Sequence, residues 1–269
     1  MKRVLFLTAA LVACDSAVTE PVAKPMLDVG VASVVGACIP TAFVRDGRPL
    51  TTAVVGTPAP IARVVIDATG CDIGIYYAPG MTGSVDQSSI AGASYFGVVN
   101  HGAQVNVTRS SVSNIGDRPF SGAQHGNAIL YTTENFVIEL PIPPATTPVI
   151  TFVTAGVAGG LVSGNQVSLY QKGGIIVRGA GASADILNNE VRGLGPVNFI
   201  AQNGIQVSFG GSAVVRENIV SENDYTPDGT TSCGILLFEA AGAKVQLNTY
   251  RDNETNLCNF GKGGGNVSQ

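Results

Sequence analysis

The sequence predicts an all-β protein in which short coils stack parallel on one another as a solenoid. Gly-Ile pairs open apolar runs at an interval of 30 residues, in "GIIVRG" at 174–179, "GIQVSF" at 204–209 and "GILLFE" at 234–239. Apolar residues in these runs alternate with period two, which is typical of strands. The 34 Gly residues and the low charged fraction of 13% also favour strands and tight turns over solvated helices.

A second repeat follows each Gly-Ile run and places Asn or Ser at a fixed position. Units of 22 to 30 residues cannot bury their apolar faces alone, so successive units must stack. Stacking would bring the polar side chains into one column, where amides can both donate to and accept from their neighbours. We therefore expect a structural ladder rather than a polar binding row, with Asp67 as an earlier member. The six copies hold Ser88, Ser110, Asn165, Asn189, Asn218 and Asn248.

The segments "GIIVRGAGASADILNNEV", "GIQVSFGGSAVVRENIV" and "GILLFEAAGAKVQLNTY" resemble the right-handed parallel β-helix, or pectate-lyase-like, superfamily. The resemblance implies right-handed coiling, about six to eight coils and an N-terminal β cap. It covers residues 73–260 and is weaker over 27–72, so we expect the cap and first coil in 27–72, the β-helix in 73–260 and a flexible C-terminal tail in 261–269.

One unit carries an insertion at 136–153, "FVIELPIPPATTPVITFV". It reads as two apolar strands around a Pro-rich turn, a hairpin-like arm. Its apolar side chains Phe136, Ile138, Ile150 and Phe152 must be covered. We expect the arm to fold back over its coil; the alternative is that it offers these side chains to a partner.

The N-terminus, "MKRVLFLTAALVAC", has two cations and then about ten apolar residues, the size of a signal-peptide core and too short to span a bilayer. Leu11-Val12-Ala13-Cys14 resembles the lipobox of bacterial lipoproteins. The resemblance implies a lipoprotein signal peptide in 1–13, a lipid on Cys14 that anchors the protein to a membrane, and localisation in the cell envelope outside the cytoplasm. Residues 14–26 read as a tether. Ordinary secretion is the alternative.

Four cysteines remain, Cys38, Cys71, Cys233 and Cys258, and an even number in an exported chain suggests two disulfides. Three pairings are possible; sequence order and the repeat favour Cys38 with Cys71 and Cys233 with Cys258. Metal binding is the rival, but no Cys-x-x-Cys motif occurs and the only two histidines are distant. We expect no metal and no cofactor. Nucleic acid is excluded as a partner because lysines and arginines form no basic run.

The longer loops lie between the strand that follows each repeated Asn or Ser position and the next Gly-Ile strand. Because they recur at the same place in each unit, we expect them to form a common surface, suited to hydroxyl-rich ligands such as polysaccharide. Solvated loops without a ligand are the alternative. This predicted loop face gathers Asp117, Arg118, His125, Tyr170, Lys172, Asn198, Gln202, Asp224, Tyr225 and Asp228.

Known catalytic patterns of the superfamily are missing, since only His-Gly pairs occur, at His101 and His125, and no acidic calcium cluster is visible. The first hypothesis is therefore a non-catalytic envelope lipoprotein whose loop face binds polysaccharide or a surface partner. The second is a polysaccharide lyase or glycoside hydrolase on the same face. The third is a purely structural spacer without a ligand. Under the second hypothesis the catalytic candidates are Asp117, His125, Lys172 and Asp224.

Overall fold

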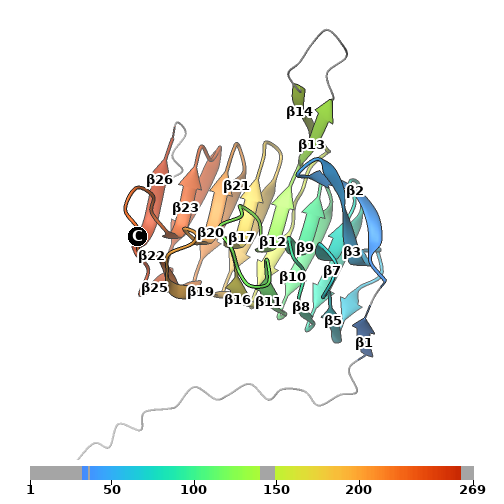
Figure 1. Cartoon of the computed structure of the whole chain (residues 1–269), viewed down its shortest axis with the longest axis horizontal. Helices are drawn as coiled ribbons and strands as arrows, with labels where there is room; N and C mark the ends of the chain where they lie inside the picture. Colours follow the sequence, from blue (N-terminus) through green and yellow to red (C-terminus); the bar gives the residue numbers. More distant parts are fainter. Residues whose placement is uncertain (1–31, 36, 140–148, 262–269) are drawn as a thin grey trace, which may run out of the picture. The chain divides into compact units, whose positions relative to one another are not determined.

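The computed structural model describes residues 32–35, 37–139 and 149–261, and these are all-β. They contain no helix, and thus none that could span a membrane. The strands form three large sheets in which neighbouring strands run parallel, apart from one antiparallel pair at an edge (Figure 1). The predicted all-β fold with parallel strands is confirmed. The predicted signal peptide, Cys14, the tether and the tail beyond Gly261 lie outside the described residues.

Each sheet takes one strand from each successive unit of the sequence. Sheet A contains β1 (Ala32–Val35), β5 (Val64–Asp67), β8 (Ser89–Ala91), β11 (Ser111–Ile115), β16 (Gln166–Tyr170), β19 (Glu190–Val197), β22 (Ile219–Tyr225) and β25 (Thr249–Arg251). Sheet B contains β2 (Ile39–Arg45), β3 (Arg48–Val55), β6 (Ile73–Tyr77), β9 (Phe96–His101), β12 (Asn127–Thr132), β17 (Gly173–Arg178), β20 (Asn203–Ser208), β23 (Cys233–Phe238) and β26 (Thr255–Phe260). Sheet C contains β4 (Ile61–Ala62), β7 (Thr82–Asp86), β10 (Gln104–Thr108), β15 (Leu161–Ser163), β18 (Ser183–Leu187), β21 (Ser212–Arg216) and β24 (Gly242–Gln246).

The main hydrophobic core takes side chains from all three sheets. Ile175 of β17, Ile186 of β18 and Val191 of β19 are each 0% exposed and belong to one cluster. The Gly-Ile runs therefore place every second side chain in this core, as period-two alternation requires.

The opposite, outer face of sheet B is also apolar over part of its width. β2, which pairs antiparallel with β3 at the edge of the sheet, covers this face: the ring centroid of Phe43 on β2 lies 5.8 Å from that of Phe96 on β9. Leu130 and Ile176, on β12 and β17, belong to this second cluster. The next strand, β20, places Gln206 in the same row, beside Ile176.

The repeated Asn side chains form a hydrogen-bonded column. The side-chain oxygen of Asn189 accepts from both the backbone and the side-chain nitrogen of Asn165, at 3.0 and 2.9 Å. Asn218 and Asn248 continue the same pattern. Asp67 does not belong to the column, because β5 pairs Val65 with Ser89 and so places Val64 beside Ser88.

The four remaining cysteines form the two disulfides that the sequence favoured. Cys38 is bonded to Cys71 and Cys233 to Cys258, with Cα atoms 5.3 and 5.9 Å apart. Cys233 and Cys258 lie on adjacent strands of sheet B. Two disulfides are typical of proteins in an oxidising compartment outside the cytoplasm.

The insertion forms an antiparallel pair, β13 (Glu134–Glu139) with β14 (Val149–Thr154). Figure 1 shows this pair extending beyond the parallel sheets. It is anchored at its base, where the side chain of Asn135 accepts from the Val44 nitrogen and donates to the Ala42 oxygen, at 2.9 and 3.0 Å. Residues 140–148 and the side chains of Phe136, Ile138, Ile150 and Phe152 lie outside the described part.

Candidate functional site

Two residues of the predicted loop face are interior, which corrects their assignment to a surface. Tyr170 and Gln202 are each 0% exposed. The Tyr170 hydroxyl donates to the side-chain oxygen of Asn223 at 2.6 Å. Gln202 accepts from the backbone nitrogen of Leu194 at 2.9 Å and donates to the carbonyl of Tyr170 at 2.6 Å. Both side chains satisfy buried polar groups and are not available to a ligand.

The other eight residues do not line a single cavity. His125 and Lys172 line a cavity on the outer face of sheet B, whereas Asp224 lines a different one with Glu222 and Asp252. The Asp117 carboxylate is hydrogen-bonded to the His125 imidazole. Tyr225, on β22, is half-buried. No group of His, Cys, Asp or Glu side chains in the described ranges could hold a metal ion. The exposed remainder is Arg118, Asn198 and Asp228.

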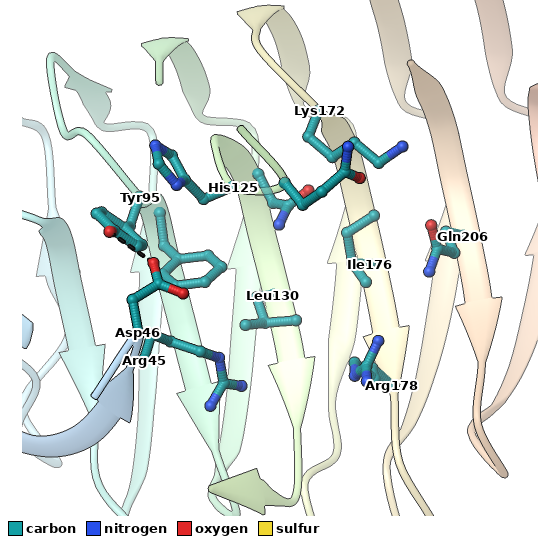
Figure 2. A pocket seen from close by; sticks show the side chains of 12 residues that line it. Arg45, Asp46, Tyr95, His125, Leu130, Lys172, Ile176, Arg178 and Gln206 are labelled. Carbon is teal, nitrogen blue, oxygen red and sulfur yellow. Dashed lines mark hydrogen bonds between the residues drawn. The ribbon is translucent and has the colours of Figure 1, made fainter. Parts of the chain in front are cut away.

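The cavity on sheet B has a volume of about 480 Å³ and opens where the β2–β3 hairpin ends (Figure 2). We call it the hairpin cavity, after β2–β3 and not after the β13–β14 arm. Leu130, Ile176 and Gln206 of three neighbouring strands form its floor, because the parallel register aligns them. Its complete lining is Arg45, Asp46, Tyr95, Phe96, Gln124, His125, Asn127, Leu130, Lys172, Ile176, Arg178 and Gln206.

One wall is a pair of stacked rings, Tyr95 and His125, with centroids 4.0 Å apart and planes 20° apart. The Tyr95 hydroxyl donates to Asp46 at 2.7 Å, which ties the ring to the β2–β3 turn. Burial and the Asp46 carboxylate raise the pKa of Tyr95 to about 12, so the phenol remains protonated at neutral pH. His125 Nε2 lies 2.8 Å from Asp117 Oδ1, which fixes the orientation of the imidazole.

The loop that carries His125 is held from beneath by Gln171, a 0% exposed residue between β16 and β17. Its side-chain oxygen accepts from the backbone nitrogens of Asp117 and Ser121, at 3.0 and 2.9 Å, and its side-chain nitrogen donates to the carbonyl of Ala123 at 2.9 Å. The Ser121 hydroxyl donates to the Asp117 carboxylate. The aromatic wall is therefore preorganised before any ligand arrives.

Three cationic side chains line the same cavity. The Lys172 ammonium donates to the carbonyl of Ala201 at 2.7 Å, and burial lowers the pKa of this amine. Arg178 donates through Nε to Glu134 at 2.6 Å. Burial, and to a lesser degree repulsion from Arg178, lower the pKa of Arg45 to about 9. Asp46 is the one carboxylate among the lining residues that the structure describes. Cations thus outnumber carboxylates in the lining.

The sequence pattern pointed to His125 and Lys172 but not to Tyr95, Arg45 or Gln171. Tyr95 directly precedes a Gly-Ile-type strand, "FGVV", and a polar-tipped aromatic at such a strand start was the available signal. No sequence signal pointed to Arg45, because no repeat in the sequence shows that β2 packs on the outer face of sheet B.

Comparison with protein-family models, with curated proteins and with solved structures found no match to this chain.

Proposed function

We propose that this protein is a non-catalytic lipoprotein of the cell envelope that binds an acidic polysaccharide in the hairpin cavity. In this proposal the three parallel sheets are the faces of a right-handed parallel β-helix of about six to eight coils, with β2–β3 in its N-terminal cap. The lipobox-like "LVAC" sequence ending at Cys14 and the two disulfides support export and anchoring.

The composition of the cavity is the observation that carries this proposal. The C–H faces of sugar rings pack against aromatic side chains, and Tyr95 and His125 supply such side chains to the cavity lining. The two rings stack on each other and the Arg48 guanidinium lies 5.3 Å from the Tyr95 centroid, so a sugar would meet the ring edges. Gln124, Asn127 and Gln206 supply amides for hydroxyl groups, and amides both donate and accept. The cations favour a glycan that carries carboxylate or sulfate groups.

Binding of the purified protein, solubilised in detergent, to a glycan array tests the proposal, with affinities of hits measured by calorimetry. Tyr95→Ala should weaken glycan binding about tenfold, because it removes the aromatic wall of the cavity and the ring on which His125 stacks. Tyr225→Ala, outside the cavity, is the matched control and should bind as the wild type does. If no glycan binds, the cavity is not a polysaccharide site and the spacer hypothesis is favoured.

A polysaccharide lyase is the second candidate, and one observation favours it. Burial lowers the pKa of Lys172, which favours the neutral amine as a base for the proton α to a carboxylate that Arg45 and Arg178 would hold. As the proton leaves, the glycosidic C–O bond at the β carbon breaks, a C=C bond forms, and the leaving sugar oxygen takes up a proton. Incubation with polyuronates would then yield unsaturated products, and the rate would rise with pH as Lys172 deprotonates. Lys172→Met should abolish these products. New reducing ends without unsaturation would instead indicate a hydrolase.

A further inference from the structure

A row of phenylalanines begins beside the hairpin cavity and runs away from it along the ends of β20, β23 and β26. The Arg178 guanidinium, which lines the cavity, lies 4.0 Å above the ring of Phe209. The rings of Phe209 and Phe238 follow with centroids 5.2 Å apart. Phe260 lies beside Phe238 in the parallel register of β26 and β23. We call Phe209, Phe238 and Phe260 the aromatic strip.

The aromatic strip is unusual in its exposure to solvent. Phe209 is 37% exposed and Phe260 is 50% exposed, whereas Leu237, the neighbour of Phe238 on the other face of β23, is 1% exposed. The remaining large apolar residues that are exposed in the described part are aliphatic and lie outside the strip. Exposed phenyl rings forgo the stabilisation that burial would provide, so the two exposed rings of Phe209 and Phe260, with the half-buried Phe238 between them, indicate a binding surface.

We propose that the aromatic strip extends the hairpin cavity into a site for a polysaccharide chain, in which successive sugar rings stack on Phe209, Phe238 and Phe260. The inference rests on the proposed function of the cavity. Parallel strands are about 4.8 Å apart, so the step from Arg178 on β17 to Phe260 on β26 covers roughly 14 Å, room for several sugar rings beyond those in the cavity.

The neighbours of the strip favour a glycan over a membrane as its occupant. Gln206 of β20 places a half-buried amide in the cavity lining at this end of the strip and donates to the buried Ser208 hydroxyl at 3.0 Å. Arg178 connects the strip to the cations of the cavity, so an acidic chain meets a charge partner at that end.

Varying the length of the oligosaccharide tests whether the aromatic strip extends the binding site of the cavity. The probes are oligogalacturonates and cello-oligosaccharides of two to eight sugar units, titrated into the full-length protein by calorimetry. Affinity should rise by about tenfold or more between the shortest and the longest binding probe, since added rings bind at a high effective concentration. Phe260→Ala and Phe238→Ala should each remove about fivefold of that gain and leave the shortest probe unaffected.

Leu247→Ala is the matched control, because Leu247 is 66% exposed but lies outside the strip. Unchanged melting temperatures will show that the variants are folded. The inference is overturned if affinity does not depend on length, or if the strip variants weaken short and long probes equally; the cavity proposal then survives. Failure of every probe overturns both. Binding to phosphatidylglycerol vesicles that the strip variants abolish, with glycan binding unaltered, would identify a membrane contact and overturn the inference.

Discussion

At the scale of the residue, Asn218 shows why a polar side chain can be structural in the interior. It is 0% exposed, its oxygen accepts from the backbone and side-chain nitrogens of Asn189, and its nitrogen donates to the carbonyl of Ile186 and to Asn248. Asn218→Leu would leave these buried partners unpaired and should lower the free energy of unfolding by about 3 kcal/mol. Urea denaturation of the variant and of the wild type measures this difference in the free energy of unfolding.

The control for that variant is Asn198→Leu, since Asn198 is exposed and lies outside the column. It should change the free energy of unfolding by less than about 0.5 kcal/mol. Equal stability of Asn218→Leu and the wild type would show that the column does not contribute to folding.

His101 is a residue whose burial should make stability depend on pH. It is 2% exposed, its Nδ1 lies 2.9 Å from the Tyr76 hydroxyl, and its Nε2 has no partner among the described residues. Burial, and to a lesser degree Arg45, lower its pKa from 6.5 to about 4. Below pH 6.5 His101 is therefore protonated in the unfolded chain but stays neutral in the folded protein. Acidification favours unfolding until the pH falls below about 4, where His101 is protonated in both states.

We expect this effect to remove about 2 kcal/mol from the free energy of unfolding between pH 7.5 and pH 5. Denaturation of the wild type and of His101→Gln at both pH values measures it. Between pH 7.5 and pH 5, the free energy of unfolding of His101→Gln should fall by about 2 kcal/mol less than that of the wild type. If both proteins respond to pH alike, other groups cause the dependence and His101 contributes nothing.

At the scale of the element, the inward face of each strand was predictable and the outer face was not. The run "GIIVR" on β17 puts Ile175 into the main core, but the next residue, Ile176, is also apolar and is 4% exposed on the other face. Alternation cannot tell what covers such a second apolar face. The covering pair β2–β3, and with it the hairpin cavity, therefore required the structure.

The same limit explains the errors in the predicted loop face. Tyr170 and Gln202 flank loops, and their residue types are common on surfaces, yet both are buried. One residue of register decides whether a side chain at a strand end points inward or outward. The repeat did predict the Asn column, because identical residues recurring at one position of stacked strands must lie beside one another.

The β13–β14 arm is an element whose removal should spare the parallel sheets. It forms its own two-stranded sheet, and its contacts to the rest of the described chain include those of Glu134 and Asn135 at its base. Replacing 136–153 by a short Gly-Ser linker keeps both anchors. Infrared and circular dichroism spectra should retain the β signature, with a melting temperature within about 4 °C of the wild type. A protein that no longer folds would show that the arm belongs to the core.

At the scale of the whole molecule, stability should be lowest in the terminal units. A central strand such as β17 pairs with β12 and β20, whereas β26 pairs only with β23 among the described strands. In a chain of stacked units, each contributes its own stability and that of its contacts with neighbours. A unit with one neighbour therefore opens more easily than a unit with two.

The Cys233–Cys258 disulfide connects that last strand to the one before it, across a sequence separation of 25 residues. Closing a loop of this size constrains the unfolded chain by about 3 kcal/mol, so its loss should act mainly on the terminal unit. In Cys233→Ser/Cys258→Ser, amide hydrogen exchange should accelerate over 233–260, while β9 and β12 keep their protection. Cys38→Ser/Cys71→Ser is the counterpart and should accelerate exchange at the N-terminal strands instead. Equal acceleration in every sheet would mean that all units unfold as one, and that stacking contacts do not localise stability as argued.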